Sequence, residues 1–138
     1  MLKTRPAKEV VVRMQNEIGA LDGIAKTIAD KGVNILAVCT WVEGAQAVVH
    51  LVTDDSVRVM DALKAHRYDA REGHVLVTEP SHKPGMLHRI TEKLAHAEID
   101  IHHLYATAST AQGQCLLVFA TANNDRAMVL LNASTSSA

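Results

Sequence analysis

The chain has 138 residues, of which 48% are hydrophobic and 21% charged, and its formal net charge is −1. This length suits one ordinary domain or two very small ones, with enough apolar material for a packed core. A near-neutral charge and only four aromatic residues argue against nucleic-acid binding, and no apolar run approaches the ~20 residues needed to span a membrane.

The predicted elements begin with a β-branched strand at Glu9–Met14, which ends in a polar turn at residues 15–19. The spacing of Leu21, Ile24 and Ile28 predicts one apolar face of a helix, and Gly32 ends that helix. Further along, the sequence predicts a hairpin of Val33–Val42 and Gln46–Thr53, a helix over Ser56–His66 and a closing strand at Tyr68–Glu72.

A second copy of the same elements follows, so the chain contains an internal repeat. Gly19 aligns with Gly85 at an offset of 66 places, and beyond the hairpin the offset becomes 68. The second copy predicts a strand at Val75–Thr78, a helix carrying Leu87, Ile90 and Leu94, a hairpin of Ile99–Ala108 and Gln114–Thr121, and a helix over Asp125–Asn132.

This order predicts an α+β protein with two ferredoxin-like βαββαβ modules, residues 8–73 and 74–138. Each module is expected to be an antiparallel sheet with both helices on one face. The last strand of the second module is missing or shortened, because the position equivalent to Tyr68 is 136 and the chain ends at Ala138 in a serine-rich segment. We therefore expect the second sheet to have an open edge or to borrow a strand from a neighbouring chain.

The turn before the first helix has the chemistry of a carboxylate site. The backbone N–H groups of Gly19, Ala20 and Leu21 have no intrahelical partner, and the helix dipole favours an anion there. Asn16 offers a donor and an acceptor for a ligand, and Asn34 could reach the same crevice or that of a paired module. The alternative is structural: Asn16 is only a helix cap and Gly19 only a turn residue.

Two segments of the chain resemble the signature of the ACT domain. They are Asn16-Glu17-Ile18-Gly19-Ala20-Leu21 with Gly32-Val33-Asn34-Ile35, and His82-Lys83-Pro84-Gly85-Met86-Leu87 with Ile99-Asp100-Ile101. The resemblance runs from about Glu9 to Asn132 and is closest in layout to small stand-alone tandem ACT proteins of bacteria. It implies modules that bind a small effector, often an amino acid, at an interface between paired modules. The ligand-binding residues implied are Asn16, Gly19, Ala20, Leu21, Asn34 and Ile35 in the first copy, and His82, Gly85, Met86, Leu87 and Asp100 in the second.

The second copy departs from the ACT pattern at two further places. His82 stands where the family has Asp or Asn before Pro-Gly, and Glu98 stands where it has a glycine before the strand. Pro84 also removes one backbone donor from the turn. The first copy is therefore the better equipped of the two for ligand binding.

From these features we expect a non-catalytic regulatory protein that binds an amino acid or a similar small carboxylate and needs no cofactor. No nucleophile–base constellation, phosphate loop or zinc motif is present. We expect a homodimer or a higher homo-oligomer, with no nucleic-acid or membrane partner. The sequence does not identify any enzyme that the protein would regulate.

The location is expected to be cytoplasmic. The charged N-terminus lacks the apolar stretch of a secretion signal. Cys39 and Cys115, the only cysteines, lie in separate apolar runs, which is typical of reduced thiols packed as small hydrophobes.

Two other functions stay open on sequence grounds. One is a protein-interaction module that oligomerises through its sheet edges and holds no ligand. The other, more remote, is a metal-responsive module that uses histidines of the second copy, among them His88 near Glu92 on the helix and His102-His103 on the strand.

Overall fold

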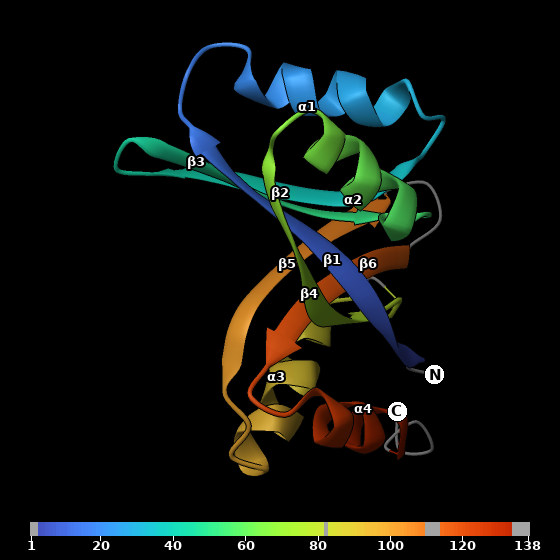
Figure 1. The fold of residues 1–138 in the computed structure, drawn as a ribbon. Coiled ribbons are helices and arrows are strands. Elements are labelled where there is room, and N and C mark those ends of the chain that lie inside the picture. The colour runs from blue at the N-terminus through green and yellow to red at the C-terminus, as the bar shows by residue number, and fades with distance from the viewer. Residues whose placement is uncertain (1–2, 82, 110–113, 134–138) are drawn as a thin grey trace. The chain divides into compact units, whose positions relative to one another are not determined.

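The computed structural model describes residues 3–81, 83–109 and 114–133. Figure 1 shows its elements in chain order, six strands and four helices. They are β1 (Thr4–Gln15), α1 (Ala20–Ala29), β2 (Ile35–Glu43), β3 (Gln46–Thr53), α2 (Ser56–Ala65), β4 (Asp69–Thr78), α3 (Met86–His96), β5 (Ile101–Ser109), β6 (Gln114–Thr121) and α4 (Asn124–Ala133).

The chain divides into two compact units. Residues 8–73 form one unit, called here the N-terminal module, and the residues from His74 onward, together with the segment up to Ala7, form the C-terminal module. The strand order is β2-β3-β1-β4 in the N-terminal module and β5-β6-β4-β1 in the C-terminal module, so β1 and β4 serve both units. The predicted α+β class with a βαββαβ pattern repeated twice is confirmed.

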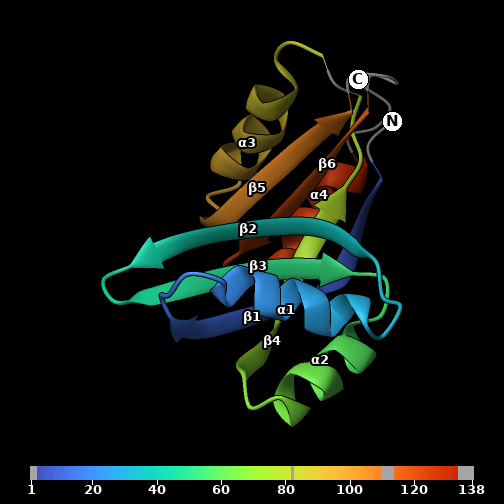
Figure 2. The same ribbon diagram turned by 90° about the horizontal axis from the view of Figure 1, so that it is seen from above.

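The core of the N-terminal module follows from strand alternation. Val10 pairs with Leu51 and Val12 with Val49, which places these four side chains on one face of the sheet. They pack with buried side chains of both helices: Ile24, Ile28, Val59 and Leu63. Figure 2 shows α1 and α2 lying along the sheet of this module. The apolar residues spaced along one face of each helix and the alternate residues of the strands thus form one core.

The C-terminal module repeats this packing with one large ring. Leu76 pairs with Phe119 across β4 and β6, and both side chains are buried. Helices α3 and α4 cover them with Ile90, Leu94 and Leu131. Phe119, the only phenylalanine in the chain, is the largest fully buried side chain.

The N-terminal segment takes the place of the strand that the sequence does not supply after α4. Residues Thr4–Ala7 belong to the C-terminal module, where β1 follows β4 in the strand order. The backbone N–H of Thr4 donates to Oδ1 of Asn132 over 2.8 Å, and Nδ2 of Asn132 donates to the Thr4 carbonyl over 3.0 Å. The expectation of an open edge or of a strand from another chain is therefore wrong, while residues 134–138 lie outside the described part.

Two predicted strands are parts of one longer strand. The sequence predicts separate strands at Tyr68–Glu72 and Val75–Thr78, but β4 runs without a break from Asp69 to Thr78. The backbone continues without a turn, and only the burial changes: residues 69–74 are mostly exposed, whereas Val75–Thr78 are buried. Likewise β1 starts at Thr4 rather than at Glu9.

The repeat extends to fine backbone detail. Strand β2 has an irregularity between Ile35 and Ala37, and β5 has the same irregularity between Ile101 and His103. Each leaves one residue without a partner in the ladder.

Within the described residues, no helix has the length and apolar character needed to cross a membrane.

Candidate functional site

The β1–α1 turn is built around a left-handed glycine. Gly19 occupies the N-cap position of α1 with φ 88° and ψ −1°, and no side chain caps this helix. The N–H of Ala20 donates to the carbonyl of Glu17 over 3.1 Å and closes the turn. A glycine adopts this conformation without strain because it has no Cβ.

This turn leaves backbone donors open, although one fewer than the sequence predicts. Ala20 N–H is engaged by Glu17, so its donor is not available to a ligand. Among the described residues, no acceptor lies against the N–H of Gly19 or of Leu21. The positive end of the helix dipole lies at the same place, and a Cβ built on Gly19 would meet no atom within 4 Å. A small anion could therefore approach this backbone closely.

Asn16 connects the turn to the β2–β3 hairpin. Its backbone N–H donates to the carbonyl of Ala45 over 2.9 Å. Its side chain does not cap α1, so the purely structural role considered for it does not occur. Asn16 is exposed. The sequence did not predict that the hairpin at residues 43–46 lies next to this turn.

Apolar side chains flank the open donors. Ile18 is fully exposed, at 106% of its reference area, and Leu21 is 42% exposed. Large apolar groups left in water next to unpaired backbone N–H groups are typical of a surface that a ligand or partner covers. The turn thus combines anion donors with apolar surface.

Asn34 and Ile35 lie at the other end of α1. Asn34 and Asp54 bond each other, with Asn34 N–H to Asp54 Oδ1 at 3.0 Å and Asp54 N–H to the Asn34 carbonyl at 3.1 Å. A helix of ten residues is about 15 Å long. Within one module the structure therefore does not bring Asn34 to Gly19.

The second copy has the same turn. Gly85 has φ 85°, and Met86 N–H donates to the carbonyl of Lys83 over 3.1 Å. Leu87 is 48% exposed, close to the 42% of Leu21 in the first copy. Met86, in contrast, packs against the core. Asp100 lies at the far end of α3, where its carbonyl accepts from Ala122. His82 lies outside the described residues.

His88 and His102 of the second copy each lie next to a single carboxylate. His88 and Glu92 approach to 3.5 Å on α3, and His102 lies 3.8 Å from Asp100. Neither pair gathers a third ligand among the described residues. Within their own pairs, His88 and His102 therefore do not form the predicted metal site.

One buried polar pair was not found by sequence reasoning. In the N-terminal module Glu9 is 1% exposed and its Oε1 lies 3.0 Å from Nδ1 of His50. The ring of Trp41 stacks on His50 with a centroid distance of 4.9 Å. The pairing comes from strands β1, β2 and β3, so only knowledge of the strand register could have predicted it.

Together these features describe an ACT-like α+β protein with two βαββαβ modules and an open helix terminus in each. No family model matches the sequence, and no curated protein does. Solved structures do match in fold. Protein BT0572 from Bacteroides thetaiotaomicron matches with a TM-score of 0.88 and 19% identity, over 96% of this chain and 90% of that one.

Two further structures carry a functional description. The regulatory subunit of aspartate kinase from Thermus thermophilus, in a ligand-free form, matches with a TM-score of 0.65 and 10% identity, over 97% of this chain and 96% of that one. A structure of aspartokinase α and β subunits matches with a TM-score of 0.67 and 12% identity, over 98% and 97%. These identities are low, so the similarity is one of fold.

Proposed function

We propose that this chain is a non-catalytic regulatory protein that binds an amino acid at the β1–α1 turn of the N-terminal module. The observation that carries the proposal is the uncapped, left-handed start of α1 at Gly19, with N–H donors facing open space. The fold shared with aspartate kinase regulatory subunits supports a regulatory role.

The chemistry of the turn favours an amino acid over a simple anion. The α-carboxylate would accept from the N–H groups of Gly19 and Leu21, as anions do at helix N-termini. The Asn16 side-chain oxygen would accept from the α-ammonium group. The side chain of the ligand would lie against Ile18, which otherwise stays in water.

Three predicted binding residues could contact a ligand only if two copies of the chain pair. They are Asn34, Ile35 and, in the second repeat, Asp100. Asn34 is separated from Gly19 by the length of α1, about 15 Å. It would therefore line the ligand site of a second copy of the chain, paired with the first. A homodimer is therefore part of the proposal, and a ligand held between copies would stabilise one arrangement of them over another. His82, Gly85, Met86 and Leu87 would form the second, weaker site.

The test is a thermal-shift screen of the proteinogenic amino acids followed by isothermal titration of those that stabilise the protein. We expect at least one amino acid to bind the wild-type chain, and Gly19→Asp to abolish that binding. The new carboxylate would fill the approach to the backbone and repel the ligand's own carboxylate. If no amino acid binds the folded protein, the proposal is wrong.

Gly32→Asp is the matched control for that variant. Gly32 also has a left-handed backbone, with φ 68°, and a Cβ added to it would meet no atom within 4 Å, but it lies beyond the opposite end of α1. The charge change is thus the same in both variants, and the backbone strain is of the same kind. Equal loss of binding in Gly32→Asp would mean that the effect is not specific to the Gly19 turn and would remove the support that Gly19→Asp gives to the site.

One observation favours the second candidate, a ligand-free interaction module. Strand β2 lies at the end of the strand order, and its side chains Leu36, Val38 and Val42 are 42%, 50% and 55% exposed. An edge strand with apolar exposure is suited to pairing with another chain. Light scattering coupled to size exclusion distinguishes the two: an assembly that forms fully and never responds to any amino acid supports this candidate.

A further inference from the structure

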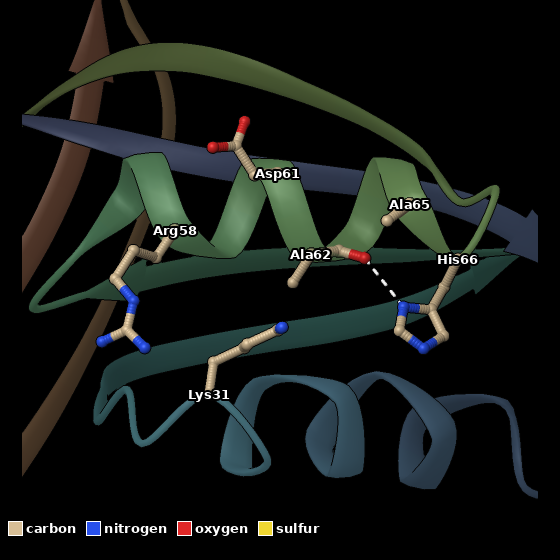
Figure 3. A pocket seen from close by; sticks show the side chains of 6 residues that line it. All are labelled: Lys31, Arg58, Asp61, Ala62, Ala65 and His66. Atoms are coloured by element: carbon tan, nitrogen blue, oxygen red, sulfur yellow. Dashed lines mark hydrogen bonds between the residues drawn. The ribbon is translucent and has the colours of Figure 1, made fainter.

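A hollow with basic side chains lies between α2 and the turn that follows α1 (Figure 3). Its volume is about 260 Å³, and it is lined by Lys31, Arg58, Asp61, Ala62, Ala65 and His66. This volume is below the ~300–1,000 Å³ usual for drug-sized ligands, so the space suits a smaller molecule. It lies at the opposite end of α1 from Gly19 and is separate from the amino-acid site proposed above.

The hollow arises from the spacing of residues on α2. Arg58, Ala62, Ala65 and His66 recur at intervals of four, three and one, which puts them on one stripe of the helix. The two alanines leave the middle of the stripe empty. Arg58 and His66 stand at its ends, separated by about 12 Å along the helix axis.

The positive charges in the hollow are not neutralised by neighbours. Within the part of the chain that the structure describes, no carboxylate forms an ion pair with Lys31 or Arg58. Asp61 points away from the gap into which Lys31 and Arg58 extend (Figure 3). The two cations therefore extend toward a common space and form no ion pair with Asp61, the one acid that lines it.

Asp30, the acid that precedes Lys31 in the chain, is already engaged. It pairs with Lys26 over 2.8 Å. That hydrogen bond is the main cause that lowers the pKa of Asp30, with smaller contributions from the charges of His66 and Lys31. Asp30 therefore stays ionised and bound to Lys26 and does not extend into the hollow as a partner for Arg58.

His66 presents a fixed ring to the same space. Its Nδ1 lies 2.9 Å from the carbonyl oxygen of Ala62, and since a carbonyl only accepts, Nδ1 carries the proton. That bond leaves Nε2 available to a ligand, as an acceptor in the neutral ring and as a donor in the protonated one. Arg58, Lys31 and His66 thus surround the hollow from three directions.

The second repeat provides an internal comparison, because the residues at the equivalent positions differ. Ala97 replaces Lys31, and Leu130 replaces Ala62. Arg126, which replaces Arg58, donates from its guanidinium to the Ala97 carbonyl over 3.1 Å. The same fold therefore uses this arginine to bind its own backbone in one repeat and leaves it unpaired over a hollow in the other.

We propose that this hollow binds the phosphate group of a small molecule. A guanidinium can donate two parallel hydrogen bonds to phosphate oxygens, and an ammonium adds a point charge from a second direction. The imidazole contributes from a third. A tetrahedral oxyanion can use all three directions at once, whereas a planar carboxylate is satisfied by the guanidinium alone.

The test is an NMR titration of the full chain with inorganic phosphate, with succinate as the carboxylate comparison. We expect phosphate to shift the amides of Lys31, Arg58 and His66 with a dissociation constant on the order of 1 mM, and succinate to bind more weakly. Lys31→Gln and Arg58→Gln should each weaken phosphate binding by about tenfold or more, because each removes a charged donor. Ala65→Leu should also abolish it by filling the hollow without a change in charge.

Lys64→Gln is the matched control, since Lys64 lies on the same helix but does not line the hollow. It should leave the phosphate affinity unchanged. An equal loss in Lys64→Gln would mean nonspecific attraction and would overturn the proposal. No saturable shift with phosphate, or tighter binding of succinate than of phosphate, would overturn it as well. None of these outcomes depends on whether an amino acid binds near Gly19.

Discussion

Glu98 holds a left-handed backbone conformation, with φ 57°, at the place where the first repeat has Gly32 with φ 68°. The sequence marks Glu98 as a departure from the ACT pattern, and the structure shows that the turn keeps its shape despite the change of residue. A side chain in this region costs about 1–2 kcal/mol, because Cβ comes too close to the following carbonyl. At this turn the C-terminal module therefore carries a strain that the N-terminal module avoids through Gly32, although the N-terminal module has its own left-handed non-glycine residue at Arg67, with φ 64°.

Replacement of Glu98 by glycine should stabilise the protein. Relief of the strain is partly offset by the larger entropy of glycine in the unfolded chain, about 0.5–1 kcal/mol, which leaves a net gain of about 0.5–1 kcal/mol. Urea denaturation of the variant measures this gain. The reciprocal change, Gly32→Glu, should lower the free energy of unfolding, and a Glu98→Gly variant less stable than wild type would contradict the explanation.

Among the secondary-structure elements, the four helices start in two different ways. Helix α2 is capped by Asp55, whose Oδ1 accepts from Arg58 N–H over 3.1 Å, and α4 is capped in the same manner by Asn123. Helices α1 and α3 start at left-handed glycines with no side-chain cap. The uncapped helices are the ones to which the ACT resemblance assigns ligand binding. A side-chain cap there would occupy the donors that a ligand needs.

Loss of the α2 cap should lower the free energy of unfolding. Asp55→Ala removes the acceptor for Arg58 N–H, and we expect the free energy of unfolding to fall by about 1 kcal/mol. Asp61→Ala is the control, since it removes the same charge from the same helix without removing a cap. Equal effects of the two substitutions in chemical denaturation would show that charge, rather than capping, accounts for the change.

At the scale of the whole molecule, strands β1 and β4 each contribute residues to both modules. Strand β4 is the fourth strand of the N-terminal module in its first half and belongs to the C-terminal module in its second half. Strand β1 is shared in the reverse sense, with Thr4–Ala7 in the C-terminal module. The C-terminal module thus includes chain from outside its own repeat. The added strand residues enlarge a unit whose size is near the lower limit for a stable core.

The N-terminal segment should therefore stabilise the C-terminal module. Asn132→Ala removes both hydrogen bonds to the Thr4 backbone, and we expect a loss of about 1–3 kcal/mol from the groups left without partners. Deletion of residues 1–7 should have a larger effect and should accelerate hydrogen exchange in β4 and β6. Asn16→Ala serves as the control, because it removes an exposed amide that does not cap a helix. Unchanged exchange in the deletion variant would refute this role.

Much of the fold was predictable because its signals are local. Helical spacing at Leu21, Ile24 and Ile28 and β-branched runs in the strands predicted the order of the elements, and that order is confirmed. The left-handed turn at Gly19 was also accessible, since glycine before a helix is a backbone signal. The structural alternative for Asn16, a helix cap, does not occur, because the turn closes through Glu17 and Ala20 instead.

Local residue patterns were enough to establish the duplication, the α+β class and the two glycine turns, since each depends on residues close together in the chain. Only the tertiary structure shows that the strand beginning at Thr4 lies in the sheet of the C-terminal module, bonded to Asn132 of α4. These two residues are separated by 128 positions, and no local preference links them. The same packing separates Asn34 from Gly19 and brings Lys31, Arg58 and His66 around one hollow. Strand pairing and helix packing set those distances, and both are fixed by burial of a shared core rather than by any short segment.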